Sequence, residues 1–289
     1  MDGIINIFKP TGVTSFDVVR KVKKISKEKK VGHTGTLDPL ASGVLPVCIG
    51  KSTKIVDLVM AGKKVYDAEM KLGEITDTYD REGKVLREAK VNLTNKEIID
   101  EVMSFKGEIS QVPPMYSALK VNGVKLYDLA RKGIEIERTS RNVTIYDMNI
   151  LNIDIPFVKF RVECSKGTYI RSLCYDIGEA LGCGAMMYNL TRISSGIFNE
   201  SKSIHLDNLN ETNFSENIIP IDKFLINYEE FVVDEKFEKL LINGVNISDK
   251  RLVSKILDQK IYRVYNIEKK FLGLARLNEN GFKMIKLLT

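Results

Sequence analysis

The chain has 289 residues, of which 44% are hydrophobic and 28% are charged, and its formal net charge is +6. These proportions are those of an ordinary globular protein, so they exclude wholesale disorder and a fibrous repeat, and its apolar runs are too short to span a membrane. Four cysteines without a Cys-x-x-Cys pair and only two histidines argue against a structural zinc site. The N-terminal apolar run is too short for a secretory signal, so we expect a cytoplasmic protein with reduced, buried thiols. If the chain is an enzyme, carboxylates must do its chemistry.

The spacing of apolar residues predicts strands and helices in mixed order. Strands are expected over residues 3–8, 66–72, 143–153 and 157–164. Helices are expected over 54–60, 94–105, 125–132 and 168–181, together with a basic helix capped by Thr14. The stretch 32–50 is rich in glycine and proline and is expected to form turns, with Pro46 breaking any strand there. Because no regular strand-helix-strand rhythm is present, the chain is predicted to be α+β with a mixed or antiparallel sheet.

The composition changes toward the C-terminus. Residues 205–222 are rich in Asn, Ser and Glu, which is typical of a linker or a surface excursion. Beyond it we expect a helix over 235–242 and strands over 261–265, 271–277 and 282–287, the last two joined by a hairpin turn at 278–281. We therefore predict two domains, a larger one over residues 1–230 and a small β module over residues 231–289.

Positive charge is concentrated on the basic helix. Between Arg20 and Lys30 there are seven lysines and arginines against Glu28 alone, which gives this window a charge of +6. The apolar stripe of Val18, Val22 and Ile25 is expected to face the core, which leaves the charges on the other faces. Such a run is either a solvated helix face or a surface that contacts phosphates, and charge alone does not decide between them.

Three polar side chains stand where a purely structural role is not obvious. Asp38 precedes a proline and is flanked by glycines, so it is either an Asx-turn residue or a reactive carboxylate to which another chain can come close. Arg171 falls in the first turn of a predicted helix, where it opposes the helix dipole and therefore needs an anionic partner, a carboxylate or a phosphate. Tyr66 lies on a predicted strand and is either a core residue or an aromatic group with a polar tip in a site.

The segment GHTGTLDPLASG at residues 32–43 resembles the catalytic signature of the bacterial TruB family of tRNA pseudouridine synthases, which modify uridine 55 in the T-loop. Three further segments resemble the same family in the same order and spacing: KPTG at 9–12, VPPMYSALK at 112–120 and KGTYIR at 166–171. The similarity covers residues 3 to about 200 almost continuously.

The resemblance implies a role for each matching residue. Asp38 takes the place of the essential aspartate, Tyr66 that of the active-site tyrosine and Arg171 that of the arginine paired with the aspartate. The other matches are His33, which enters the T-loop where the target nucleotide has left, Leu190 as an apolar wall, Lys9 as a supporting lysine and Asp80 as an acid that helps to hold the arginine.

The resemblance also implies a pseudouridine-synthase core with a catalytic cleft and a small C-terminal RNA-binding module like the PUA barrel. Because the isomerisation changes neither redox state nor water content, no cofactor or metal is expected. The expected partner is the T-arm stem-loop of tRNA, bound by a monomer that flips the target base out. Whether Asp38 attacks C1′ or removes the 2′ proton is open at this point. The alternatives are a tRNA-binding or folding chaperone without catalytic activity and a hydrolytic nucleosidase.

Overall fold

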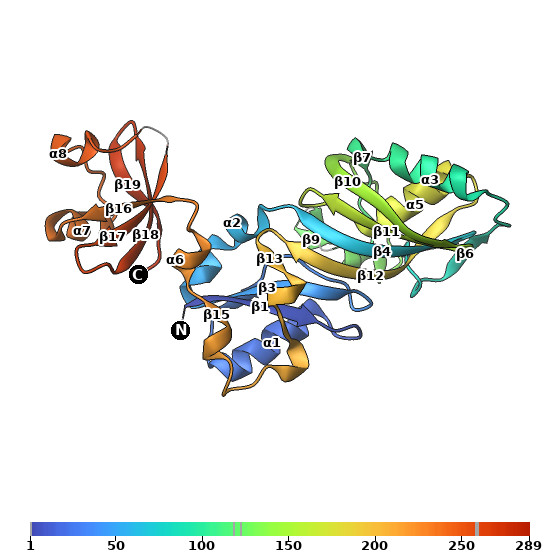
Figure 1. Ribbon diagram of the computed structural model, residues 1–289, viewed down its shortest axis with the longest axis horizontal. Coiled ribbons are helices and arrows are strands. Elements are labelled where there is room, and N and C mark those ends of the chain that lie inside the picture. Colours follow the sequence, from blue (N-terminus) through green and yellow to red (C-terminus); the bar gives the residue numbers. More distant parts are fainter. Residues whose placement is uncertain (1, 118, 122, 258–259) are drawn as a thin grey trace.

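The computed structural model describes residues 2–117, 119–121, 123–257 and 260–289. A large curved sheet forms the body of the molecule, and a small C-terminal β module lies at one end of it (Figure 1). Residue 118 of the motif at 112–120 lies outside the described residues. Within the part that is described, no helix is both long enough and apolar enough to cross a membrane.

In the described part of the chain the large sheet has eleven strands, with the main order β14-β1-β3-β12-β4-β11-β10-β7. Its strands are β1 (Gly3–Lys9), β2 (Val31–His33), β3 (Ser42–Ile49), β4 (Lys64–Leu72), β7 (Gly107–Gln111), β10 (Arg141–Asp154), β11 (Phe157–Cys164), β12 (Ala185–Ser195), β13 (Phe198–Asn199), β14 (Ile204–His205) and β15 (Ile218–Ile219). Most neighbours are antiparallel, but β12 runs parallel to β3 and β14 runs parallel to β1. The predicted mixed sheet is therefore confirmed.

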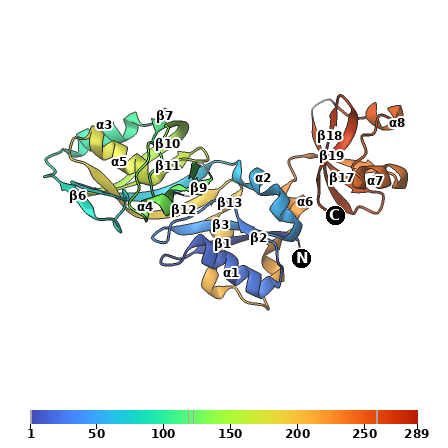
Figure 2. The ribbon, with the colours of Figure 1, turned by 180° about the vertical axis from the view of Figure 1, so that it is seen from behind.

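Helices cover the large sheet where its side chains are apolar. They are α1 (Ser15–Ser26), α2 (Val56–Met60), α3 (Asn95–Ser104), α4 (Leu126–Ala130), α5 (Ile170–Ala180) and α6 (Ile221–Phe224). Helix α1 begins with the predicted capping box of Thr14 and Asp17 and buries Val18 and Val22 in the same core as β1 and β3. Helix α5 packs against β12 and β4, and α3 lies beside it over β10 (Figures 1 and 2). The two short sheets are β5 (Glu74–Thr76) with β6 (Val85–Glu88) and β8 (Lys120–Val121) with β9 (Val124–Lys125).

The C-terminal module is a four-stranded sheet in the order β16-β17-β18-β19. Its elements are β16 (Glu229–Val233), α7 (Glu235–Ile242), α8 (Lys250–Val253), β17 (Ile261–Asn266), β18 (Phe271–Asn278) and β19 (Gly281–Leu287). The predicted helix, the three strands and the hairpin at 278–281 are confirmed, whereas β16 was not predicted. Leu274 and Leu288 of the module join Ile4 and Cys48 of the large sheet in one apolar cluster, so the two parts share a packed interface.

Two expectations about the body were wrong. Residues 42–49 form a full strand through Pro46, because the carbonyl of Pro46 accepts hydrogen bonds from the N–H and hydroxyl of Thr34. The missing N–H of Pro46 therefore faces this loop and not the ladder with β1, so the proline breaks no strand-strand hydrogen bond. The predicted linker at 205–222 is also part of the fold, since its Leu206, Leu209 and Phe214 are buried in the main core.

One central strand was not predicted. Strand β12 pairs with β4 along most of its length and with β3 at its end, and it carries Leu190. Its sequence, AMMYNLTRISS, lacks a clear alternation of apolar and polar residues because both of its faces are partly buried.

Candidate active site

The loop that carries Asp38 lies between β2 and β3 and is held from below by the start of α1. The hydroxyl of Ser15 accepts a hydrogen bond from the N–H of Leu37 at 2.8 Å and donates to its carbonyl at 2.9 Å. One turn earlier, the N–H of Gly12 donates to the carbonyl of Pro39 at 2.8 Å. The residues on both sides of Asp38 are therefore fixed to the first helix.

Asp38 meets Arg171 across this loop. Nε of Arg171 lies 3.1 Å from Oδ2 of Asp38, and the Arg171 side chain is only 7% exposed while that of Asp38 is 34% exposed. In the described part of the chain, no backbone N–H donates to the Asp38 carboxylate within its own turn, so the ion pair and not an Asx turn is its main contact. Arg171, in the first turn of α5, therefore has the anionic partner that the sequence analysis predicted for it.

Asp80 holds the other side of the same guanidinium. Its Oδ2 lies 3.4 Å from Nη1 of Arg171, while its Oδ1 accepts hydrogen bonds from the hydroxyl of Thr78 at 2.6 Å and the N–H of Glu82 at 3.1 Å. Arg171 also donates to the carbonyls of Thr78 at 3.3 Å and Tyr116 at 2.6 Å. One buried guanidinium thus joins α5, the β5-β6 turn and the 112–120 segment to the Asp38 loop.

The surroundings of Asp38 shift its proton affinity upward. Desolvation in this densely packed recess raises the pKa of Asp38 above its ordinary value of 3.8; the charge of Arg171 opposes the rise and that of Asp80 adds to it. Burial therefore favours the neutral acid, and the cationic neighbours Arg171 and Lys9 favour the ionised carboxylate. A pKa perturbed by desolvation and by specific charge partners is typical of functional carboxylates.

Tyr66 stands beside this group, on the inner face of β4. Its ring is 6% exposed, and burial raises the pKa of its hydroxyl, against the charge and the hydrogen bond of Arg192. Arg192 is directly opposite Tyr66 on β12, is 1% exposed and donates to the carbonyls of Val44 at 2.6 Å and Gly35 at 3.1 Å. Tyr66 therefore belongs both to the core and to the edge of the site.

Arg192 was missed by the sequence analysis because its strand was missed. The available signal was the charge of Arg192 within the half-apolar run of β12. An arginine is rarely buried unless its donors are satisfied, so one in such a run indicates a buried arginine that has acceptors. Gly43 confirms how closely β12 and the Asp38 loop approach: its φ is +112°, and a Cβ there would lie 2.3 Å from the carbonyl oxygen of Arg192.

Lys9 and His33 lie under and beside the loop. The ammonium of Lys9 is fully buried and donates to the carbonyls of Val13 at 2.7 Å and Pro10 at 2.9 Å, with that of Pro39 at 3.5 Å. Burial lowers the pKa of Lys9 to about 8, although the nearby Asp38 raises it. Burial and the charge of Arg192 both lower the pKa of His33, so its half-buried imidazole is neutral at pH 7.

Leu190 lines a groove that begins beside the catalytic loop. The groove has a volume of about 410 Å³, and its apolar wall is formed by Leu190 with Leu40, two residues after Asp38. Its polar wall carries Asp67, Glu69 and Asn189 from the outer face of the sheet. The structure thus brings Arg171, Asp80, Tyr66, Lys9 and His33 together around the loop of Asp38. Leu190 is connected to this loop through Leu40, and the described residues that line the groove do not include Asp38, Arg171 or Tyr66.

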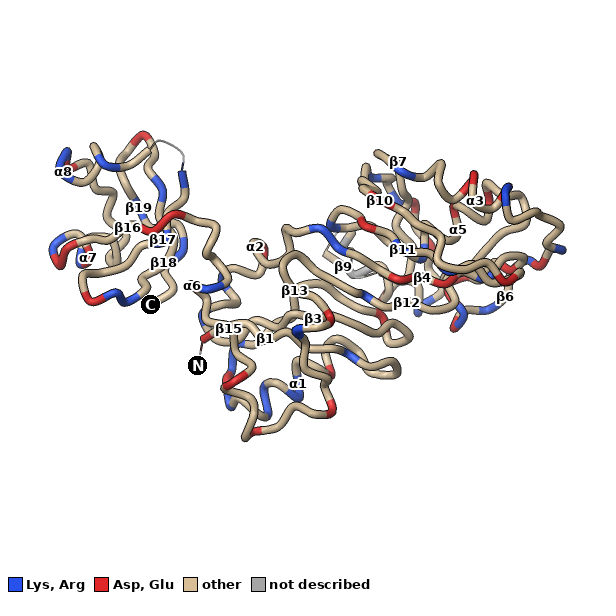
Figure 3. Tube along the Cα trace, in the orientation of Figure 1, with Lys and Arg blue, Asp and Glu red and all other residues tan. Residues whose placement is uncertain are grey.

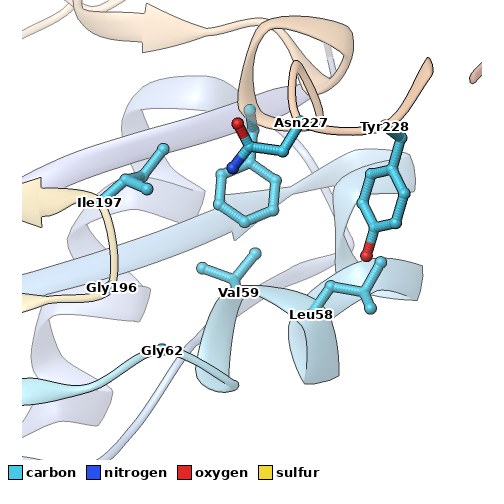
Figure 4. A pocket seen from close by; sticks show the side chains of 8 residues that line it. Leu58, Val59, Gly62, Gly196, Ile197, Asn227 and Tyr228 are labelled. Atoms are coloured by element: carbon cyan, nitrogen blue, oxygen red, sulfur yellow. The ribbon is translucent and has the colours of Figure 1, made fainter. Parts of the chain in front are cut away.

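A second pocket lies away from these residues, between α2, the turn after β12 and the segment after α6 (Figure 4). It has a volume of about 190 Å³, and Leu58, Val59 and Ile197 line it together with Asn227 and Tyr228. It contains no charged side chain, so it does not extend the site chemically. Across the described residues, no cluster of three His, Cys, Asp or Glu side chains could hold a metal ion, and the four cysteines are buried as free thiols.

Comparison with known proteins gives matches along the chain. A model of the TruB family pseudouridylate synthase N-terminal domain matches residues 23–170, and one of the tRNA pseudouridylate synthase B C-terminal domain matches residues 171–233. The chain is 75% identical over 289 residues to the tRNA pseudouridine synthase B of Clostridium acetobutylicum and 60% identical over 288 residues to that of Clostridium novyi, with 100% of both chains covered in each case.

Solved structures show the same fold. The crystal structure of a Cbf5-Nop10-Gar1 complex includes a chain that is 30% identical and superimposes with a TM-score of 0.70, over 98% of this chain and 79% of that one. A loop aspartate paired with a buried arginine and a match to both family domains lead to one conclusion. The chain belongs to the TruB family of pseudouridylate synthases.

Proposed function

We propose that this protein converts uridine 55 in the T-loop of tRNA into pseudouridine, with Asp38 as its reactive group. The observation that carries the proposal is the ion pair of Asp38 and Arg171 at 3.1 Å, with Asp80 on the other side of the same guanidinium. The tRNA substrate is supported by the names of the relatives, which are tRNA pseudouridine synthases over their full length.

The proposed reaction needs one carboxylate and no external reagent. The bond between N1 of uracil and C1′ of the ribose breaks, the base turns, and a bond forms between C5 and C1′. The proton then leaves C5 and N1 gains one, so atoms and charge balance without oxidant, reductant or water. A site that holds one positioned carboxylate and excludes solvent is therefore sufficient.

Asp38 acts on the ribose by one of two routes. As a nucleophile it attacks C1′ as the uracil leaves, and as a base it removes the 2′ proton. Arg171 keeps the carboxylate ionised and directed in either case, because desolvation alone would favour the neutral acid. Deuterium at C2′ separates the routes, since only abstraction of the 2′ proton gives a primary isotope effect on the rate.

The remaining residues hold the nucleotide and the loop. Tyr66 stacks on the flipped uracil near C5, and Leu190 forms the apolar wall against which the ring lies. His33, neutral and five residues from Asp38, fills the gap that the flipped base leaves in the T-loop. Lys9 fixes the backbone of the Asp38 loop through its bonds to carbonyls, and Asp80 fixes Arg171.

The tRNA backbone is bound by the basic residues of α1 and of the segment that follows it, which appear as blue segments of the tube near the lower edge of the molecule in Figure 3. Of its basic residues, Lys21 donates to the carbonyl of Leu206 and Arg20 pairs with Asp17, so both are engaged within the protein. Lys23, Lys24, Lys27, Lys29 and Lys30 are exposed, and no ion pair joins any of them to another described residue. In this proposal residues 1–230 form the catalytic domain and 231–289 an accessory RNA-binding module of a monomeric enzyme.

The test is direct. Unmodified tRNA is incubated with the protein, without metal or nucleotide, and pseudouridine is mapped along the RNA. Formation at position 55 supports the proposal; modification at another position would contradict the assigned site. If the protein refolds denatured tRNA while forming no pseudouridine at any position, it acts as a chaperone and the proposal is wrong.

A further inference from the structure

Arg141, the first residue of β10, has hydrogen-bond donors without acceptors. Its Nε and Nη2 are buried and have no hydrogen-bond partner, and among the described residues no carboxylate forms an ion pair with it. Its guanidinium makes a cation–π contact with Tyr169, whose ring centroid lies 4.9 Å from the guanidinium carbon. An aromatic face attracts the positive charge but accepts none of the in-plane N–H groups.

Such a group needs an explanation, because enclosed guanidinium donors are normally satisfied. The loss of hydration is unfavourable unless an acceptor replaces the water, and an arginine offers five donors in a planar fork. Arg141 is half-buried as a residue, and the two fully buried arginines of this region obey the rule: Arg171 meets two carboxylates and two carbonyls, and Arg192 meets two carbonyls. Arg141 is the exception in the described part of the site.

Its position ties it to the catalytic residues. Gln111 is paired with Arg141 across β7 and β10, and its side-chain amide accepts from the N–H of Tyr169 at 2.8 Å and donates to the Tyr169 carbonyl at 3.0 Å. Tyr169 is two residues before Arg171. Arg141 is therefore fixed relative to the Asp38 and Arg171 pair by a short, rigid connection.

The turn beside the guanidinium is open and positively charged. Gly167 has a φ of +86°, and a Cβ there would lie 3.7 Å from Nη1 of Arg141, so this backbone passes close to the guanidinium. Lys166, next in the chain, is exposed. Because no hydrogen bond holds the Arg141 fork in place, it can rotate toward a ligand that enters this turn.

We propose that Arg141, with Lys166, binds a phosphodiester of the RNA strand next to the flipped nucleotide. A phosphate offers two acceptor oxygens to the planar fork and neutralises its charge, which supplies what the protein leaves unsatisfied. The inference rests on the proposed function for the identity of the RNA, and it adds an anchoring contact at the start of β10, separate in the chain from the basic run of α1.

The test compares four proteins: wild type, Arg141→Met, Arg141→Lys and Arg161→Met. Methionine keeps the apolar contact with Tyr169 but removes the charge and the donors. Arg161 is the control, because Asp67 already satisfies its guanidinium at 2.6 and 2.8 Å on the neighbouring strand β11. Affinity for an unmodified T-arm stem-loop is measured at several salt concentrations. Arg141→Met should bind roughly tenfold more weakly and flatten the slope of log affinity against log salt by about one unit; Arg141→Lys should keep most of the slope, and Arg161→Met should match wild type.

A second measurement locates the phosphate. Stem-loops with a single uncharged methylphosphonate at successive positions are bound to wild type and to Arg141→Met. At one position the substitution should weaken binding to wild type but not to the variant, because the two changes remove the same contact. If no position shows this coupling and the salt slope of Arg141→Met is unchanged, the proposal is wrong. A variant that loses only its saturated rate would assign Arg141 to the positioning of Tyr169 and would equally overturn it.

The two proposals fail separately. If Arg141→Met and one methylphosphonate position are coupled but wild type forms no pseudouridine, the phosphate site is supported and the proposed reaction is refuted. Pseudouridine formation by wild type without coupling would refute the phosphate site alone. Removing an unsatisfied buried cation should also leave the melting temperature unchanged or higher, which keeps the binding data free of unfolding.

Discussion

Two groups of positive charge in this protein behave in opposite ways. Arg171 is buried, and two carboxylates and two carbonyls surround it. Five exposed lysines lie at the end of α1 and just after it: Lys23 and Lys24 are in its last turn, away from the buried Val18 and Val22, and Lys27, Lys29 and Lys30 follow the end of the helix at Ser26. The neighbours of a buried charge hold its side chain in one position, so the charge fixes the geometry of the groups around it. An exposed charge is screened by salt and acts on molecules that diffuse toward it. Under the proposed function, the first arrangement would serve the chemistry and the second would serve binding.

The largest effect should come from Asp38→Asn, which leaves both groups of charge in place and removes the reactive carboxylate. An amide is neither nucleophile nor base, so the rate should fall more than about a thousandfold while tRNA affinity stays within about tenfold. Single-turnover assays and filter binding measure the two. Turnover by the variant above about one part in a thousand of the wild-type rate would show that another group does the chemistry.

Arg171→Met tests the buried arrangement as a structural unit. It leaves the Asp80 carboxylate enclosed without its cation, which typically lowers the free energy of unfolding by about 3–5 kcal/mol. Urea denaturation measures the loss. In the double variant Arg171→Met with Asp80→Asn, much of it should return, because the unpaired charge is gone. A single variant as stable as wild type would mean that the ion pairs are too solvated to matter.

The rate should also depend on pH through Asp38. Its pKa is raised by desolvation, so the ionised form is lost as the pH falls through a value above the ordinary 3.8, and the rate should drop about tenfold per unit below it. For stability the sign is reversed: the folded state holds this proton more tightly than the unfolded chain, so this group stabilises the fold at low pH and the contribution is lost as the pH rises. Initial rates of wild type and urea titrations, both from about pH 4 to about pH 8, check the two signs. In the urea titrations Asp38→Asn is the control, because it lacks the titrating carboxyl group.

The α1 face should show the smaller, salt-dependent effect. Neutralising Lys23, Lys24, Lys27 and Lys30 to Gln should weaken tRNA binding and flatten its salt slope by about one unit or more, with the saturated rate and the melting temperature little changed. A control that neutralises Lys84, Lys90 and Lys96, exposed residues around β6 and α3, should keep the wild-type slope. If the quadruple variant keeps it too, α1 is a solvated face.

The smallest effect is expected from removing metal. On a prefolded stem-loop, whose structure does not need magnesium, excess EDTA should leave the rate unchanged, because carboxylate and guanidinium groups supply all the charges that the proposed reaction uses. Loss of activity with EDTA and its recovery with zinc would contradict this proposal.

The candidate site residues came from the resemblance of the sequence motifs to a known family. Local rules drew attention to Asp38, Tyr66 and Arg171, as a carboxylate between glycines and before proline, an aromatic ring on a strand and an arginine in the first turn of a helix, but they left each residue with a structural alternative. The mixed sheet, the capped basic helix and most of the C-terminal module also followed from periodicity. Local rules work there because each feature depends on residues a few positions apart.

What the sequence could not determine depends on contacts between distant segments. Strand β12 is recognisable only through its partners β3 and β4, because a strand buried on both faces loses the alternation that identifies it, and Arg192 was missed with it. The strand through Pro46 depends on Thr34 facing the position without an N–H. The same holds for Arg141, since nothing in its neighbourhood in the chain shows that its donors lack acceptors. Sequence determined which groups are chemically able to act, and the tertiary structure decided which of them are buried, satisfied or left open to a ligand.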